Sequence, residues 1–119
     1  MIAPVISVAL GGALGAVLRY GVGLAVAFPF GTLAVNILGS FAIGAIWAHL
    51  SAKGLHHWLP FIMTGLLGGF TTFSAFSLDA LRLVEHGRLV AAGAYVVVSV
   101  ICALLACAAG VWIIRGVTA

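Results

Sequence analysis

Two phenylalanines, Phe73 and Phe76, stand three residues apart in an uncharged stretch that also carries hydroxyl groups. On a helix this spacing puts both rings on one face. The edge of an aromatic ring carries partial positive charge, so ring edges along a narrow path can contact an anion without binding it tightly. Thr72 and Ser74 add hydroxyls beside the rings. The pattern favours an anion path, although most phenylalanines in membrane helices simply pack against core or lipid.

Other polar side chains lie inside apolar runs. Asn36 is the only carboxamide in the chain, and its NH2 group offers two donors suited to an anion. An interhelical hydrogen bond explains a buried amide equally well. Arg19 is an intramembrane ionisable residue and hence a functional candidate, although its side chain could instead reach the membrane surface. Tyr95 and Ser99, four residues apart, place two hydroxyls on one helical face.

These residues must be positioned by helices that cross a membrane. Of the 119 residues, 65% are hydrophobic and 6% are charged, whereas a soluble domain has about 25% charged residues. The apolar runs are long enough to span hydrocarbon, which takes roughly 20 residues of helix. We therefore expect an all-α integral membrane protein without a cleavable leader. It forms one domain over residues 1–119, with spans at about 4–27, 32–50, 60–83 and 89–114.

The third span is expected to be broken near its middle. Gly68 and Gly69 lie there, and each glycine weakens a helix by about 1 kcal/mol relative to alanine. The hydroxyls of Thr71 and Thr72 can bond to backbone carbonyls and bend the helix further. Non-helical backbone within the membrane is tolerated only where protein buries it or where it lines a polar cavity. Freed carbonyls there suit a small cation, and a kink without a ligand is the alternative.

Glycines four residues apart occur on two of the spans. Gly11 and Gly15 lie on the first span, and Gly65 and Gly69 lie on the third. Small residues let helix backbones approach closely in lipid, where no hydrophobic drive exists between helices. Both glycine pairs therefore predict packing faces.

The charged residues are few and scattered. The basic residues are Arg19, Lys53, Arg82, Arg88 and Arg115. They form no patch for nucleic acid, and no nucleophile–base or metal-ligand constellation indicates an enzyme. Asp79 is expected to pair with Arg82, three residues on. If the N-terminus is inside, two basic residues fall on each side, so the chain has no preferred orientation. Two oppositely oriented copies could then pair about an axis in the membrane plane.

Three long motifs follow one another along the chain. Residues 11–20 read GGALGAVLRY, residues 31–41 read GTLAVNILGSF and residues 68–76 read GGFTTFSAF. Together they resemble the signature blocks of the Fluc (CrcB-type) fluoride channels, and the resemblance covers the full chain. It implies a dual-topology antiparallel homodimer in the lipid bilayer of a bacterial inner membrane. Two pores in that dimer would export fluoride passively from the cytoplasm and protect against its toxicity.

The resemblance also implies roles for individual residues. By motif position, Phe73 and Phe76 would be the pore-lining aromatics and Asn36 the pore amide. Arg19 would lie toward the vestibule of the pore. The remaining residues of the expected ion pathway are Thr72, Ser74, Tyr95 and Ser99.

A cation site is implied by the same motifs. Gly68 and Thr71 of both subunits would supply backbone carbonyls to a central structural sodium ion. Ala75 stands where many members have threonine, so one hydroxyl near the ion path is missing. Ala103, one turn after Ser99, likewise stands where some members keep a hydroxyl.

Two other classes of membrane protein fit parts of the pattern. A small multidrug-type proton-coupled transporter needs a membrane-embedded carboxylate, whereas the first span here carries Arg19 and no acid. A structural membrane subunit would explain the glycines but not Asn36, the broken third span and the phenylalanine pair together. The sequence therefore predicts a fluoride channel.

Overall fold

Apolar runs of this length fold as helices because only a helix satisfies every backbone polar group within one segment in lipid. The computed structural model describes residues 2–118. Its element order is α1 (Ile2–Ala25), α2 (Phe30–Lys53), η1 (His56–Trp58), η2 (Pro60–Leu67), α3 (Gly68–Phe70), α4 (Phe73–Glu85) and α5 (Leu89–Thr118). Four stretches are long and apolar enough to cross a membrane: Ile2–Ala25, Phe30–Lys53, His56–Glu85 and Leu89–Thr118. The predicted four-helix membrane fold is confirmed.

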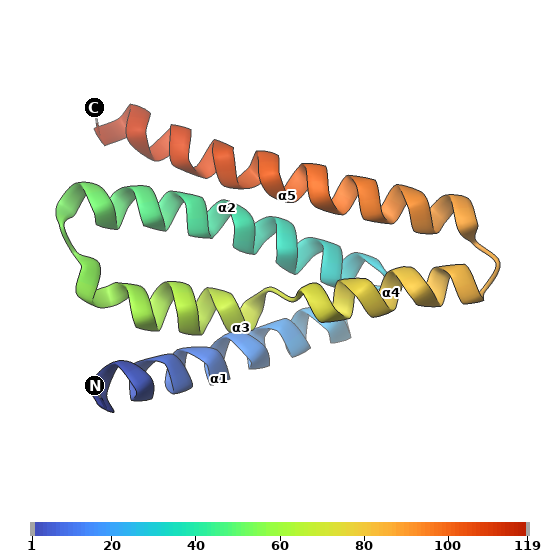
Figure 1. Cartoon of the computed structure of the whole chain (residues 1–119), viewed down its shortest axis with the longest axis horizontal. Coiled ribbons are helices and arrows are strands. Elements are labelled where there is room, and N and C mark those ends of the chain that lie inside the picture. Colours follow the sequence, from blue (N-terminus) through green and yellow to red (C-terminus); the bar gives the residue numbers. More distant parts are fainter. Residues whose placement is uncertain (1, 119) are drawn as a thin grey trace.

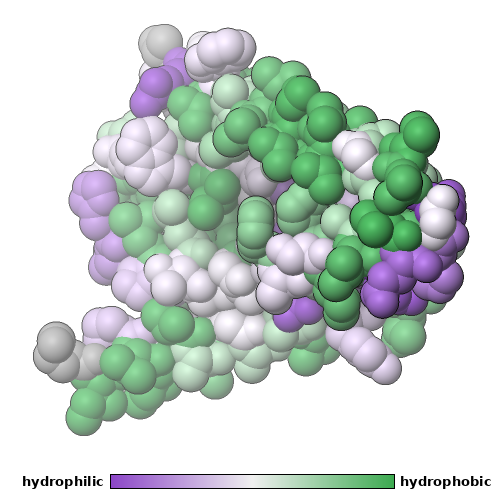
Figure 2. Space-filling model, turned by 45° about the vertical axis from the view of Figure 1, so that its right-hand side comes forward, coloured by the Kyte–Doolittle hydropathy of each residue, from purple (hydrophilic) through white to green (hydrophobic). Residues whose placement is uncertain are grey.

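The helices lie side by side, and η2, α3 and α4 together make the third of them (Figure 1). α2 packs along α5, whereas α1 packs along η2 and α3. Both termini lie at one end of the bundle with the turn after α2, and the turn between α4 and α5 lies at the other end. Figure 2 shows apolar surface over most of the visible face, with the hydrophilic side chains toward its margins. This distribution is that of a multi-pass membrane protein.

Glycines determine how closely α1 approaches the third span. A Cβ atom on Gly65 would lie 3.1 Å from the Cα of Gly11, and one on Gly69 would lie 3.1 Å from the Cα of Gly12. A Cβ on Gly15 would lie 2.8 Å from the backbone nitrogen of Phe70. Since these neighbours are backbone atoms, they cannot rotate away from an added methyl group. The predicted packing faces are confirmed: Gly11 and Gly15 on α1, and Gly65 and Gly69 on the third span.

The predicted break in the third span is confirmed, and it lies at Thr71 and Thr72, a few residues after the paired glycines. Gly68 is helical, with φ −63° and ψ −37°. Thr71 is extended at φ −91° and ψ 158°, and Thr72 at φ −155° and ψ 120°. Gly69 instead provides close packing against α1. The break therefore lies within the predicted segment, but the flexibility of glycine does not cause it.

A small core lies between α4 and α5. Phe76, Leu83, Ala92 and Tyr95 form it and are buried. Elsewhere most of the surface of α1 and α5 is uncovered within the chain. The core therefore fixes one face of α4, namely the face that carries Phe76.

Candidate ion pathway

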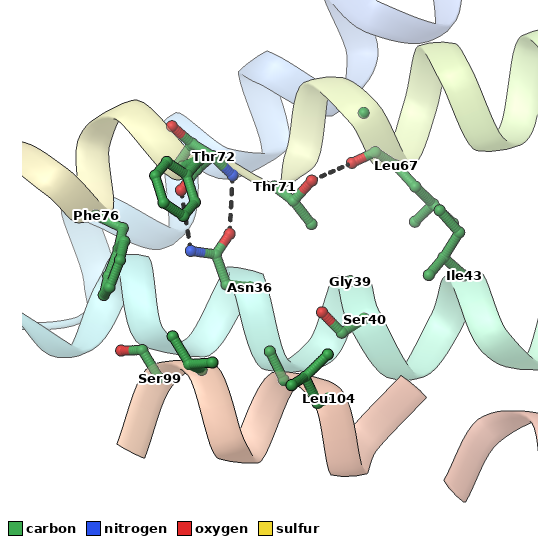
Figure 3. Close-up of a pocket in the computed structure, with 14 residues that line it drawn as sticks. Asn36, Gly39, Ser40, Ile43, Leu67, Thr71, Thr72, Phe76, Ser99 and Leu104 are labelled. Carbon is green, nitrogen blue, oxygen red and sulfur yellow. Dashed lines mark hydrogen bonds between the residues drawn. The ribbon is translucent and has the colours of Figure 1, made fainter. Parts of the chain in front are cut away.

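Asn36 holds the break in the third span by two hydrogen bonds to Thr72. Its Nδ2 donates to the Thr72 carbonyl oxygen at 3.0 Å, and the Thr72 backbone N–H donates to its Oδ1 at 2.8 Å (Figure 3). Buried backbone groups need partners, and the amide supplies both at the point where the helical pattern ends. A side-chain amide has two N–H donors. One of the two Asn36 N–H groups expected to contact an anion therefore donates to Thr72 instead, and the other remains free for the ion.

The threonine hydroxyl groups at the break form hydrogen bonds with backbone atoms. Thr72 Oγ1 accepts a hydrogen bond from the Ala75 N–H at 3.1 Å, which caps the start of α4. The same Oγ1 lies 3.3 Å from Ser74 Oγ. Thr71 Oγ1 donates to the Leu67 carbonyl oxygen at 2.9 Å. Thr72 is therefore the residue that both ends the break and starts the next helix.

A groove of about 410 Å³ runs beside the break. In Figure 3 the break lies above the groove and α5 below it, with Asn36 and Ser40 of α2 between them. The groove brings together these predicted pathway residues: Asn36, Thr72, Phe73, Phe76 and Ser99. Ser40 also lines it and was missed from the sequence. Its position four residues after Asn36, on the same helical face, is the signal that points to it.

The two phenylalanines contact one another at the groove. Their ring centroids lie 5.4 Å apart, with the ring planes tilted by 60°. Phe76 is 8% exposed and lies 5.4 Å from the Tyr95 ring, whereas Phe73 is 77% exposed. The core therefore holds one ring, and the chain by itself leaves the other ring uncovered.

Two of the predicted hydroxyls on α5 have different surroundings. Ser99 is 5% exposed, and among residues 2–118 its Oγ has no hydrogen-bond partner. A buried polar atom without a partner calls for an explanation, and a ligand in the groove would be one. The Tyr95 hydroxyl instead donates to Asp79 Oδ2 at 3.4 Å, a contact that the sequence did not indicate. The predicted pairing of Asp79 with Arg82 is confirmed at 3.9 Å.

Arg19 approaches the break from α1. Its Nε donates to the Gly69 carbonyl oxygen at 3.0 Å, so its side chain is directed at the break and not at the membrane surface. A second cavity of about 340 Å³ is lined by Arg19, Thr72 and Ala75 among others. Thr72 thus borders both cavities, with the phenylalanine pair on one side of it and the arginine on the other.

The carbonyl oxygens just before the break lose their helical partners, and those of Gly68 and Thr71 are among them. In a continuous helix the N–H of Thr72 would bond to Gly68 and that of Ala75 to Thr71. These N–H groups go instead to Asn36 Oδ1 and Thr72 Oγ1. Carbonyl oxygens suit hard cations, and both Gly68 and Thr71 border the groove. The two residues predicted to hold a cation therefore have the chemistry for it. Within residues 2–118 there is no His/Cys/Asp/Glu cluster that could hold a metal ion.

Comparisons with known proteins relate the whole chain to one family. The family model described as CrcB-like protein, Camphor Resistance (CrcB), matches residues 6–111. A fluoride-specific ion channel FluC of Paracoccus denitrificans is 50% identical over 119 aligned positions, covering 96% of each chain. Its counterpart in Cereibacter sphaeroides is 51% identical over 122 positions, covering 98% of each chain. That of Rhizobium etli is 49% identical, covering 91% of this chain and 93% of the relative.

Proposed function

This chain belongs to the CrcB-like family, and on that basis we propose that it is a fluoride channel in a bacterial inner membrane. It lets fluoride leave the cytoplasm passively and thereby protects against fluoride toxicity. The groove is the observation that carries this proposal, because it gathers two phenylalanine rings, the second amide N–H of Asn36 and a serine hydroxyl without a partner in residues 2–118, all at a break in a membrane-crossing helix.

Fluoride is small and strongly hydrated, so a pore has to replace the water that the ion loses. The remaining N–H of Asn36 and the hydroxyl of Ser99 are donors that line the groove. The ring edges of Phe73 and Phe76 add a weaker positive potential. Conduction requires binding that permits entry and also release, and this mixture of donors and ring edges meets that requirement better than a fixed cation does.

A second copy of the chain, inserted in the opposite orientation, completes each pore in this proposal. Two observations support a homodimer. Phe73 is 77% exposed although it belongs to the candidate pathway, so a partner is needed to enclose it. Lys53 lies in the last turn of α2 and Arg115 in the last turn of α5, whereas Arg82 lies in the last turn of α4 and Arg88 in the turn that follows it. Figure 1 places the ends of α2 and α5 at one end of the bundle and the turn between α4 and α5 at the other. Apart from Arg19 within α1, the two ends therefore carry equal numbers of basic residues, which leaves the orientation unbiased.

The carbonyl oxygens of Gly68 and Thr71 would hold a sodium ion between the two copies. Their loss of helical partners supports this site, and sodium, a hard cation, prefers oxygen ligands. When bound, the ion would join the two chains and raise the local potential for anions. Thr71 itself is held in place by the bond from its hydroxyl to Leu67.

The test is fluoride efflux from liposomes containing purified protein, followed with a fluoride electrode. Phe73→Ile and Phe76→Ile each remove a ring edge, and each is expected to stop efflux while the protein remains dimeric. Phe41→Ile is the matched control, because Phe41 lies on α2, is 39% exposed and does not line the groove. Full efflux from either pathway variant contradicts the role of the rings. Chloride that passes as fast as fluoride through the unaltered protein contradicts the substrate.

A further inference from the structure

Asp79 is one of only two acidic residues in the chain, and it is 8% exposed. It lies three residues after Phe76 on α4, so the two side chains are neighbours on one helical face. Tyr95 contacts both of them, since its ring packs on Phe76 and its hydroxyl donates to the carboxylate. A buried negative charge thus lies next to a path proposed for an anion. Unless another group cancels its field, it opposes the passage of fluoride.

Arg82 is placed to cancel that field. Its Nη1 lies 3.9 Å from Asp79 Oδ1, whereas Tyr95 contacts the other oxygen, Oδ2. The Arg82 guanidinium also lies over the ring of Phe28, 4.3 Å from its centroid. Phe28 belongs to the connection between α1 and α2, so a second segment of the chain holds the guanidinium in place. The arginine side chain is about half exposed, at 49%, and that of the aspartate 11%.

We propose that Arg82 is a positioning residue for the anion path, which acts by neutralising the Asp79 carboxylate beside the phenylalanine pair. The proposal rests on the proposed fluoride function. It adds that fluoride passage requires a positive charge at position 82 as long as Asp79 is negative. It does not require Arg82 to contact the ion. It also accounts for a carboxylate that is retained in a pathway wall, since the tyrosine hydroxyl donates to one of its oxygens and the arginine forms an ion pair with the other.

The experiment measures initial fluoride efflux from liposomes for the unaltered protein and four variants. A bare unit charge about 10 Å from the ion, at an effective dielectric constant near 20, slows passage roughly tenfold, which is the loss expected for Arg82→Gln. Arg82→Lys keeps the charge and is expected to stay within about threefold of the unaltered rate. The double variant Asp79→Asn with Arg82→Gln removes both charges and is expected to recover to within about threefold.

Arg88→Gln is the matched control, because it removes the same charge from the next turn of the chain, beyond the Asp79 and Arg82 pair. An unchanged rate in Arg82→Gln overturns the inference. A double variant as slow as Arg82→Gln also overturns it, because the loss would then come from missing packing or from attraction by Arg82 itself. If neither the unaltered protein nor the Arg88→Gln control releases fluoride, the proposed function fails as well. Efflux from these two proteins with no effect at Arg82 removes only the inference.

Discussion

At Asn36 one side-chain amide bonds to both backbone groups of Thr72 and replaces the helical partner that the Thr72 N–H has lost. A buried backbone group left without a partner costs about 1–3 kcal/mol, so the amide both stabilises the break and presents its second N–H to the groove. Asn36 therefore has both a structural role and a proposed contact with the ion. Ser99 is the opposite case, because its hydroxyl bonds to nothing within residues 2–118 and can serve a ligand alone.

Replacing Asn36 with alanine is expected to lower the free energy of unfolding by about 1–3 kcal/mol, because the backbone N–H of Thr72 loses its partner. Fluoride efflux should fall with it. Thermal unfolding in detergent measures the first effect and liposome efflux the second. Ser40→Ala, one turn further along α2 and also in the groove wall, is expected to change stability by less than about 0.5 kcal/mol. Equal losses of stability in the two variants would contradict the role of Asn36 in stabilising the break.

Replacing Ser99 with alanine is expected to slow fluoride efflux by about tenfold without lowering stability, since the hydroxyl forms no bond that folding would lose. Thermal unfolding and efflux on the same preparation separate the two effects. Ser77→Ala is the control, because that hydroxyl is exposed and bonds only to its own helix, at the Phe73 carbonyl. A Ser99 variant that conducts at the full rate would remove this residue from the pathway.

Among the helices, the third span is the element on which the site depends, and α1 determines its position. η2 and α3 pack against α1 through glycines whose neighbours are backbone atoms. α4, beyond the break, packs against α5 instead. The two halves of the span therefore belong to different helix pairs. The break is where the chain changes from one pair to the other, and Asn36 of α2 bridges that point.

Gly65→Ala is expected to destabilise the protein by about 1–3 kcal/mol, because the added methyl group overpacks against the α1 backbone. Its Cβ would lie 2.9 Å from the Val8 carbonyl oxygen. Gly93→Ala on α5 is the matched control, since a Cβ there meets nothing within 4 Å. That change is expected to stabilise the helix by up to about 1 kcal/mol. Thermal unfolding compares the two variants, and equal effects would mean that α1 does not pack as described.

For the whole molecule, the important property is how the basic residues are distributed between the two ends of the helix bundle. Apart from Arg19 within α1, the basic residues divide two and two between the ends, and the chain leaves one pathway ring uncovered. Both observations support a functional unit larger than one chain. The proposed antiparallel homodimer then requires that similar numbers of chains insert into the membrane in each of the two orientations.

Reporter fusions at the C-terminus are expected to be detected on both sides of the membrane. Replacing Ser51 and Ala52 with lysine adds two positive charges at the end that carries Lys53 and is expected to move most reporters to the cytoplasmic side. Fluoride efflux per unit of protein should then fall, because fewer opposite pairs form. Two lysines at the other end, placed at Val84 and Leu89, should reverse the bias. A reporter found on one side only in the unaltered protein contradicts dual topology.

The sequence predicted the four helices, the glycine packing faces and the segment that contains the break. Length and hydropathy are sufficient for the helices, and residue spacing is sufficient for the packing faces. The position of the break could not be predicted, because it depends on Asn36, whose partner Thr72 lies 36 residues away. The bond from Arg19 to Gly69 spans 50 residues and leaves no local signal for the same reason.

Thr72 borders both cavities, so the two chambers share one thin wall. Both chambers draw on α2 and α4, whereas α5 lines only the chamber of the phenylalanine pair and α1 only the chamber that holds Arg19. A change at Ser99 therefore alters the chamber of the phenylalanine pair alone, and a change at Arg19 alters the other chamber alone. A change at Thr72 alters both at once, so the shared wall is the part of the molecule least free to vary.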